Sequence, residues 1–492
     1  MDGDTAPARG LSKSRFCQGL QCLKQLWWRV HEPDAPELTP RPALQAIFDR
    51  GHQVGERAQA EFPGGTLIGH EHWEVERKLA DTRAALAAGA PAIFEAAFLA
   101  DGVFVAVDVL ERRPDGHALV EVKSTLRVKD AFIPDVAIQL HVLRASGLAV
   151  PRAEVMHLDR RCRFPDLSNL FVREDVTAAA EAFLPSVPAH LARMKAAMAG
   201  PLPAVAIGPH CEEPYECPFL ARCWPAVADD HVTHLYKGTA LAGRLLAQGI
   251  ASLGDVPGRT ALTPIQARQV AAARTGALVV EERLGDSLVP LEPPVAYLDF
   301  ETIAPAIPAW EGCGPYTAVP VQLSCHVVGA DGATVHHEWL ADGPADPRPE
   351  AAAAVVHACR GARTVVAYNA AFERRCLEHL AEHVPGARRP VEEVAARLVD
   401  LLPIVRENVY HPAFGGSFGV KAVAPALLEG FDYAGLEIGE GGVASAALEG
   451  LLLGGAGLAP EARDRLRRSL LAYCAQDTLA MVRLVERLRA LA

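Results

Sequence analysis

The segment Val295-Ala296-Tyr297-Leu298-Asp299-Phe300-Glu301-Thr302 follows two prolines and is rich in β-branched and aromatic residues. Such a stretch predicts a β-strand that begins this part of the chain. Because side chains two residues apart on a strand point the same way, Asp299 and Glu301 are expected to share one face. Far downstream, Tyr473 and Asp477 are four residues apart in a predicted helix, so they lie one above the other.

The sequence around this segment predicts a mixed α/β fold. We expect three antiparallel strands, then a fourth strand that runs directly into a helix, and a long amphipathic helix at the end. Strands combined with crossover helices are typical of this class. The expected strands cover 295–300, 319–328, 334–340 and 365–368, and the helix after them covers 370–383.

The first part of the chain holds a second acidic pattern, on a predicted hairpin. Folding the hairpin about its Pro-Asp-Gly turn brings Asp108 opposite residues 121–122. Glu121 and Lys123 are two residues apart and share a face, and Gln139 lies on the helix expected next. The strands of this predicted meander cover 93–99, 103–110 and 118–123, and helices are expected at 43–62 and 134–143.

Asp108 and Glu121 would repel one another unless a divalent cation lay between them. Mg²⁺ or Mn²⁺ prefers such oxygen ligands, and would polarise a phosphodiester and activate a water molecule. Lys123 would then hold that water or stabilise developing negative charge. The ordinary alternative is a surface strand that carries Glu and Lys in alternation.

The eleven cysteines are unevenly distributed. In a chain without secretory features they suggest metal binding or buried thiols before disulfides. Cys17 and Cys22 lie near the start, and Cys211, Cys217 and Cys223 lie within 13 residues of one another. The other six are scattered singly and are expected to be small buried side chains.

Together these patterns resemble the iron–sulfur branch of the PD-(D/E)xK nucleases, which contains the RecB-like and AddB-type nuclease domains. The matching order is cysteine, Asp, Glu-x-Lys, Gln and a cysteine triplet, and Cys22 lies in the stretch Leu-Gln-Cys-Leu-Lys-Gln-Leu-Trp. The resemblance implies a [4Fe–4S] cluster that ties the two ends of the domain together. It implies Cys22, Cys211, Cys217 and Cys223 as cluster ligands, Asp108 and Glu121 as metal ligands, and Lys123 and Gln139 as further catalytic residues.

Three of these assignments have alternatives. Cys17 competes with Cys22 as the fourth cluster ligand, and the first gap of the cysteine triplet is wider than in those relatives. A structural zinc site or unligated buried thiols would replace the cluster. His52 lies where some relatives place a metal-binding histidine, although a solvated helix histidine is the more ordinary explanation.

The last part of the chain resembles the DnaQ-like, or DEDD, 3′–5′ exonuclease superfamily on the RNase H-like fold, in its tyrosine variant. The resemblance implies that Asp299, Glu301 and Asp477 bind two metal ions and that Tyr473 orients the attacking water. The second motif of that superfamily supplies Asp after Asn-x-x-Phe, where this chain has Glu373. The alternative is a strand with an exposed acidic edge.

More of this part is similar to one uncharacterised bacterial family, a DnaQ-related domain of unknown function fused behind an iron–sulfur nuclease. From this resemblance we expect a substrate groove in which Lys421 and Tyr316 contact phosphate or stack on a base. Tyr316 in a packed core is the equal alternative, and Asp400 is a candidate additional or replacement acid. The matching stretches are 315–316, 319–322, 410–412, 416–421, 433 and 436–438.

The sequence therefore predicts three parts. Residues 1–230 would form an iron–sulfur PD-(D/E)xK restriction-endonuclease-like domain, and residues 291–492 a DnaQ-like exonuclease domain with a mixed sheet. Residues 231–290 would form a helical module between them. Within it, residues 245–256 resemble a helix-hairpin-helix unit, whose glycine turn presents backbone N–H groups to a phosphate, and a plain helical linker is the alternative.

Composition narrows the function further. Lys+Arg 48 against Asp+Glu 60 gives a net charge of −12, which excludes a protein-wide polycation that coats nucleic acid. The start lacks the features of a signal peptide and charges interrupt the longest apolar stretch, so a soluble cytoplasmic protein is expected. We thus expect a Mg²⁺- or Mn²⁺-dependent nuclease that acts on DNA in repair, recombination or defence. The alternatives are a nucleic-acid-binding scaffold with one or both centres inactive, and an RNA-processing 3′–5′ exonuclease.

Overall fold

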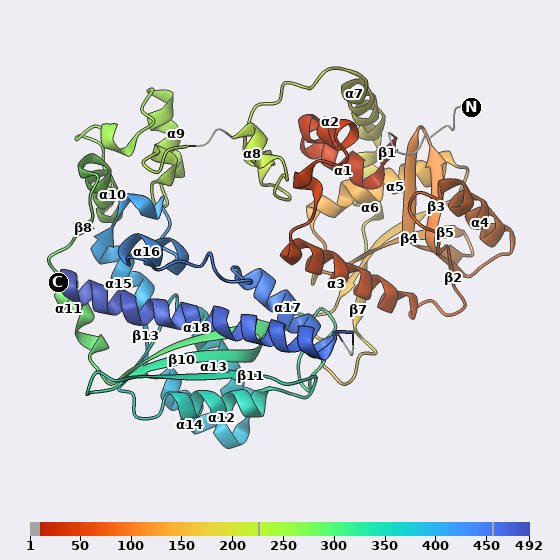
Figure 1. Cartoon of the computed structure of the whole chain (residues 1–492). Coiled ribbons are helices and arrows are strands. Elements are labelled where there is room, and N and C mark those ends of the chain that lie inside the picture. The colour runs from red at the N-terminus through yellow and green to blue at the C-terminus, as the bar shows by residue number, and fades with distance from the viewer. Residues whose placement is uncertain (1–9, 225–226, 455–456) are drawn as a thin grey trace. The chain divides into compact units, whose positions relative to one another are not determined.

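A computed structural model describes residues 10–224, 227–454 and 457–492 (Figure 1). Two compact units make up the chain. Unit 1 contains residues 1–226 together with 305–316, and unit 2 contains residues 227–304 and 317–492. The expected helical module at 231–290 therefore lies within unit 2, and a short segment from the last part of the sequence belongs to unit 1.

A seven-stranded mixed sheet forms the centre of unit 1. Its strands are β1 (Leu11–Ser12), β2 (Thr66–Leu67), β3 (Ala92–Ala100), β4 (Val103–Arg113), β5 (Gly116–Lys123), β6 (Arg152–Leu158) and β7 (Phe171–Asp175). They are ordered β2-β3-β4-β5-β6-β7, and β1 pairs with β4 in parallel. The expected meander is confirmed, because β3, β4 and β5 pair consecutively in antiparallel fashion. After it the chain returns through α5 (Ile133–Ala145) to β6, which is parallel to β5.

Helices cover both faces of this sheet. The main core packs one face against α1, α2, α5 and α7, while α3 packs on the other face. The expected helix at 43–62 corresponds to α3, which ends three residues earlier, and the one at 134–143 lies within α5. The remaining bounds are α1 (Lys13–Gln21), α2 (Leu23–His31), α3 (Pro42–Gln59), α4 (Val75–Ala87), α6 (Thr177–Phe183), α7 (Val187–Ala199) and α8 (Leu220–Cys223).

The alternation of buried residues along β4 breaks at Asp108. Val105 and Val107 belong to the main core, but beyond Asp108 it is Leu110 that joins this core, while Val109 packs on the opposite face with α3. Irregularities of this kind are common beside functional sites, because they re-aim side chains. Asp108 thus lies where the pleat of the strand reverses.

Unit 2 contains a five-stranded mixed sheet ordered β11-β10-β9-β12-β13. Its strands are β9 (Val295–Ile303), β10 (Val319–Val328), β11 (Thr334–Leu340), β12 (Thr364–Ala367) and β13 (Leu398–Asp400). The three expected antiparallel strands are confirmed as β9, β10 and β11. The fourth, β12, is parallel to β9, and β13, which the sequence did not reveal, is parallel to β12. A separate two-stranded sheet pairs β8 (Val279–Val280) with β14 (Val409–Tyr410).

Strand β9 divides its side chains between the two faces of this sheet. Its even-numbered apolar residues pack against α12, α13 and α14, whereas Val295 and Tyr297 pack in the core that contains α18. Asp299 and Glu301 continue the odd-numbered series, so they face α18. Figure 1 shows α18, in dark blue, crossing one face of the sheet while α12 and α14 lie on the other. The helices are α12 (Arg348–Ala358), α13 (Ala371–His383), α14 (Arg388–Ala395), α15 (Leu401–Asn408), α16 (Val420–Leu427), α17 (Gly441–Leu453) and α18 (Pro460–Leu491).

Residues 245–256, expected as a helix-hairpin-helix unit, contain only the last residues of one α-helix. Helix α9 (Thr239–Ala247) stops before a turn at Gly249, whose φ of 77° favours glycine. A single 3₁₀ turn at Leu253–Asp255 follows, and α10 (Pro264–Thr275) begins only later. A small apolar core joins these elements, and α11 (Leu284–Leu288) leads to β9. In the described part of the chain, no helix combines the length and the hydropathy needed to cross a bilayer.

Candidate functional site

The four residues predicted as a centre in unit 1 are brought together. Glu121 is buried on β5, and Gln139 Nε2 on α5 donates to its Oε2 at 2.7 Å. Lys123 Nζ lies 2.6 Å from Glu121 Oε1. Asp108 Oδ2 accepts from the Val122 amide at 2.8 Å, as expected of its partner in the hairpin.

Two charged residues that the sequence did not single out complete this cluster. Lys13, the first residue of α1, places Nζ 3.4 Å from Asp108 Oδ1 and 3.3 Å from Glu121 Oε2. Asp135 Oδ2 lies 2.8 Å from Lys123 Nζ. An ammonium group therefore lies at the place where a divalent cation was expected.

The sequence could have indicated one of these two residues, Asp135. Asp135 precedes Gln139 by one helical turn, and its Oδ1 accepts from Gln139 Nε2 at 3.3 Å, so the predicted helix already placed both on one face. Lys13 has no comparable signal. It reaches the carboxylates because β1 pairs with β4, a contact between segments that are remote in sequence.

The pKa values in this cluster follow from how well each charge is compensated. Burial opposes ionisation of Glu121, but the charges of Lys123 and Lys13 outweigh burial and lower the pKa of Glu121. For Asp108, burial and then the Glu121 charge dominate and raise the pKa of Asp108 to about 7. Glu121 is consequently ionised at neutral pH, with its own cations beside it.

Glu95 is a further acid of this centre. It lies on β3, and its charge adds to the raised pKa of Asp108. Its φ of 57° is left-handed, which is uncommon for a residue other than glycine. Such strained residues cluster at functional sites, where they aim side chains that a regular strand would turn elsewhere.

Two candidates of the sequence lie apart from the sites proposed for them. Cys17 faces the acidic cluster: burial first, and then the charge of Asp135, raise the pKa of Cys17 to about 12. It does not line the pocket that Cys22 lines, because the chain breaks from α1 into α2 at Cys22. His52 is exposed on α3, and within the described residues no hydrogen bond or ion pair joins it to Asp108 or Glu121.

Tyr316, expected in a substrate groove or in a packed core, is packed. It belongs to segment 305–316 of unit 1 and is partly buried against a cluster that includes Leu158 and Cys162. Its Oη lies 2.7 Å from Ser124 Oγ and donates to the Ser124 carbonyl at 2.7 Å. Because Ser124 follows Lys123, Tyr316 fixes the end of the strand that carries this lysine.

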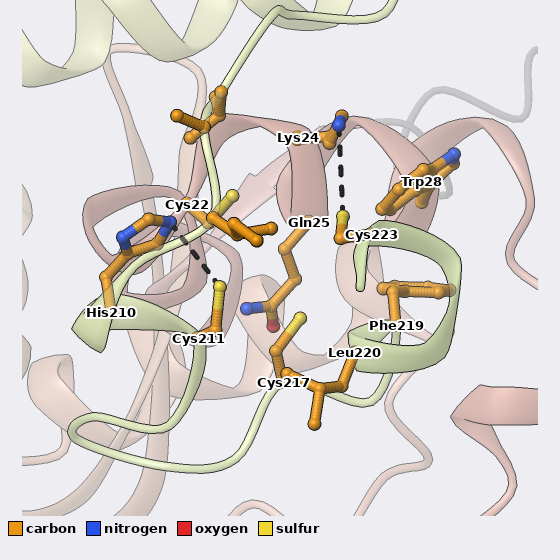
Figure 2. A pocket seen from close by; sticks show the side chains of 13 residues that line it. Cys22, Lys24, Gln25, Trp28, His210, Cys211, Cys217, Phe219, Leu220 and Cys223 are labelled. Atoms are coloured by element: carbon orange, nitrogen blue, oxygen red, sulfur yellow. Dashed lines mark hydrogen bonds between the residues drawn. The ribbon is translucent and has the colours of Figure 1, made fainter. Parts of the chain in front are cut away.

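The four predicted cluster cysteines surround one pocket of unit 1, as Figure 2 shows. Cys22 lies between α1 and α2 with an extended backbone, φ −160° and ψ 119°. Cys211 ends a 3₁₀ turn at Pro209–Cys211, Cys217 lies in the loop after it, and Cys223 ends α8. The amide of Cys217 donates to the Cys211 carbonyl at 2.8 Å. This hydrogen bond bends the loop around the pocket. Cys223, on α8, lines another part of the same pocket.

The four thiols share one pocket but do not converge as the ligands of a single metal ion. Burial, and then the other three thiols, raise the pKa of Cys217, so the four groups influence one another. Nevertheless, no three Cys, His, Asp or Glu side chains among the described residues converge at the spacing of one metal ion. Zinc holds all its ligands at roughly 2.0–2.3 Å, whereas an iron–sulfur cluster distributes four thiolates over its iron atoms.

Four carboxylic acids of unit 2, from β9, α13 and α18, lie near one another. Asp299 and Glu301 lie on β9, Glu373 lies in the first turn of α13, and Asp477 lies on α18. Burial first, and then the charges of the other three acids, raise the pKa of Asp299 well above its usual range. All four predicted acids are therefore together, with Glu373 in the position where the resembling superfamily has Asp.

Ionisation of these acids is strongly opposed. Burial, and then the Asp477 charge, raise the pKa of Glu301 to about 8. Burial also raises the pKa of Glu373 to about 7, and it raises the pKa of Asp477. Among the described residues, none of the four forms an ion pair with Lys, Arg or His.

Two oxygen atoms of this group lack partners. Glu373 Oε2 and Asp477 Oδ1 are buried and accept no hydrogen bond from the described residues. Buried carboxylate oxygens without donors are costly, and hard oxygen ligands with uncompensated charge suit Mg²⁺ or Mn²⁺. Because no three of the acids converge at metal-ligand spacing, binding an ion requires rotation of their side chains.

Tyr473 and Lys421 lie beside these acids. Tyr473 is buried on α18, and Lys421 Nζ on α16 donates to its Oη at 2.8 Å and to the Gly439 carbonyl at 2.7 Å. The next residue on α18, Cys474, donates from Sγ to Asp299 Oδ2 at 3.3 Å. The charge of Lys421 opposes the raised pKa of Glu301.

Asp400 has a structural role at the edge of this centre. Its Oδ1 accepts from the Leu402 amide, which caps α15, and from the Asn369 amide, both at 2.9 Å. Asn369 has a left-handed φ of 66°, so this bond holds the sharp turn from β12 into α13. Asp400 therefore positions Glu373 through the turn.

Residues 296–419 match a family described as a domain of unknown function, DUF2779. The match begins on β9 and contains Asp299, Glu301 and Glu373, while Tyr473 and Asp477 lie beyond it. It contains several of the stretches expected to match an uncharacterised family, and its description names no nuclease. A search of curated proteins finds no match to the chain.

Proposed function

We propose that the protein is a metal-dependent nuclease that hydrolyses phosphodiester bonds of DNA, and that the centre of unit 2 cleaves. In this proposal unit 2 has the RNase H-like fold of the DnaQ-like exonucleases, and unit 1 is a PD-(D/E)xK-like domain with a [4Fe–4S] cluster. Its setting would be bacterial DNA repair, recombination or defence.

One observation supports the proposal above all: the four acids of unit 2 lie together, with Glu373 buried and the other three partly buried, and among the described residues none of them has a compensating ion pair. Buried charges in proteins are normally paired or coordinate metals. Here Glu301 has a pKa of about 8 and Asp477 has an oxygen without a donor. Acids without a compensating charge lower the stability of the folded protein, and bound divalent cations would offset this loss.

In this proposal, the position of each residue of the unit 2 centre determines its role. Asp299, Glu301 and Asp477 would hold the cations, and Glu373 would reach them from α13. The cations, when bound, stabilise the entering and leaving oxygens of the phosphoryl transfer. Tyr473, held by Lys421 at 2.8 Å, would orient the attacking water toward the phosphorus.

Unit 1 would contribute a cluster and a second centre. Cys22, Cys211, Cys217 and Cys223 would hold the [4Fe–4S] cluster and so close a long loop, which favours the folded state. The bound cluster supplies one-electron redox chemistry. Asp108, Glu121, Lys123 and Gln139 would form the nuclease centre.

The position of Lys13 favours a second candidate function for unit 1. Its ammonium lies between Asp108 and Glu121, so this centre is neutralised without a metal. Unit 1 would then bind nucleic acid without cleaving it. An RNA-processing exonuclease is the corresponding alternative for unit 2.

End-labelled single-stranded DNA and RNA of one sequence, incubated with Mg²⁺ or Mn²⁺, test the proposal. Asp299→Asn should abolish cleavage from the 3′ end, while Asp464→Asn, an exposed position of the same helix as Asp477, should leave it unchanged. Lys123→Ala should remove a separate activity if unit 1 cleaves. Loss of no activity in Lys123→Ala, with DNA binding retained, would favour the scaffold for unit 1. Cleavage unaffected by Asp299→Asn would refute the proposal for unit 2.

A further inference from the structure

Gln25 presents an unused hydrogen-bond donor to the cysteine pocket. Its side chain is only 2% exposed, and Nε2 donates to no acceptor among the described residues. Figure 2 shows the amide in the pocket, between Cys211 and Cys217. Leaving a buried donor unsatisfied costs about 1–3 kcal/mol, so its presence indicates an acceptor that occupies the pocket.

Arg29 fixes the orientation of this amide. Arg29 lies one turn after Gln25 on α2, and its Nε donates to Gln25 Oε1 at 3.2 Å. The opposite orientation would set the NH₂ group of the amide against the guanidinium, donor facing donor. The oxygen therefore faces Arg29, and the NH₂ group faces the pocket.

Two more side-chain nitrogen atoms lie near the sulfur atoms. Lys24 Nζ lies 3.8 Å from Cys223 Sγ, and His210 Nε2 lies 3.9 Å from Cys211 Sγ. Apolar side chains, including Trp28 and Phe219, form much of the remaining wall. A pocket with several donors and an apolar wall suits an anionic, sulfur-rich group, whose electronic properties such donors adjust.

We propose that Gln25 donates a hydrogen bond to a sulfur of the bound cluster and, with Lys24, raises its reduction potential. This inference rests on the proposed cluster and adds a tuned redox property to its structural role. An electron supplied by a low-potential one-electron donor makes the cluster more negative without breaking any bond. An N–H donor and a nearby ammonium stabilise that added charge, so they favour the reduced form.

A reductive titration of the anaerobically purified full chain, followed by electron paramagnetic resonance, tests the proposal. Iron and sulfide are counted first. Gln25→Met keeps the length of the side chain and removes the donor, and Lys24→Met removes the charge. Each variant should shift the one-electron equilibrium about tenfold toward the oxidised form, which is roughly 59 mV.

Gln53→Met, an exposed glutamine on α3 of the same unit, is the matched control and should leave the potential unchanged. An unchanged potential in Gln25→Met with a complete cluster would overturn the proposal.

A measurement on the unsubstituted protein covers the case in which Gln25→Met assembles no cluster. With ¹⁵N in the glutamine side chains, pulsed paramagnetic resonance of the reduced cluster should detect coupling to a glutamine nitrogen, and absence of that coupling would overturn the proposal. A chain purified without iron and sulfide would instead refute the cluster itself, and is recognised before any titration.

Discussion

Glu121 of unit 1 and Glu301 of unit 2 lie on central strands beside other acids, yet their pKa values move in opposite directions. Lys123 and Lys13 lower the pKa of Glu121 despite burial, whereas burial and Asp477 raise the pKa of Glu301 to about 8. The difference lies in the cations that the fold itself supplies. Lys13 and Lys123 lie 3.3 and 2.6 Å from Glu121, and within the described residues Glu301 has no ion pair.

This contrast teaches that grouped acids alone do not define a metal centre. Where the fold supplies lysines that neutralise grouped acids, no metal is needed to balance their charge. A divalent cation can then bind only by displacing one of the lysines. Grouped acids without such partners destabilise the folded state, and binding of a cation removes this destabilisation. The two centres should therefore respond differently to substitution, to metal and to pH.

The largest effect is expected from Glu121→Gln. The substitution removes the charge that Lys13 and Lys123 face in a buried site, so unit 1 should lose about 3–5 kcal/mol of unfolding free energy. Denaturant unfolding of the full chain measures this change. Glu181→Gln, which breaks the exposed pair with Arg144 at 2.9 Å, should cost less than about 1 kcal/mol. Equal effects of the two substitutions would contradict internal neutralisation.

Lys13→Met should convert unit 1 toward the behaviour of unit 2. Without this ammonium the acids keep only Lys123 as a cation, so Mn²⁺ should bind unit 1 about tenfold more tightly, or 1.4 kcal/mol. Calorimetric titration in a Glu301→Gln background isolates the site. Lys195→Met, an exposed lysine of unit 1, serves as the control. Unchanged affinity in Lys13→Met would show that Lys13 does not compete with the metal.

Glu301→Gln should stabilise unit 2 when metal is absent. The substitution removes an acid that Asp477 repels, which should add about 1 kcal/mol at pH 8 in the presence of a chelator. The sign is opposite to that of Glu121→Gln, and thermal unfolding with chelator measures it. A destabilised variant would mean that Glu301 has a partner that stabilises its charge.

The stability of metal-free unit 2 should fall as pH rises from 4.5 to 8. Glu301 has an unfolded-state pKa near 4.5 and a folded-state pKa of about 8, so between these values the folded chain binds more protons than the unfolded chain. Stability then decreases with increasing pH. Thermal unfolding across this range in chelator should show the decline, and Glu301→Gln should reduce it. A flat profile shared by both proteins would exclude this linkage.

Much of the unit 2 centre could be predicted from local periodicity. The spacing of two along a strand placed Asp299 and Glu301 on one face, and the spacing of four placed Tyr473 above Asp477 on a helix. Glu373 was indicated by the resemblance to the DnaQ-like superfamily, in whose second motif it stands. The first two inferences depend only on the geometry of single elements.

The contacts that distinguish unit 1 depend on long-range pairing and were missed. Lys13 reaches Asp108 through the pairing of β1 with β4, for which two-residue β1 offers no pattern. The break between α1 and α2 sends Cys17 and Cys22 to different sites, although they are five residues apart. Segment 305–316 belongs to unit 1 although it lies in the last part of the sequence. Nothing in its composition indicates that it belongs to unit 1.

Mn²⁺ titration of a matched pair, Asp108→Asn in unit 1 and Asp299→Asn in unit 2, compares the two centres most directly. The acids of unit 2 lack internal cations, so the tightest Mn²⁺ site of the unsubstituted protein should vanish in Asp299→Asn and remain in Asp108→Asn. Loss of that site in Asp108→Asn, with Asp299→Asn unaffected, would contradict the account.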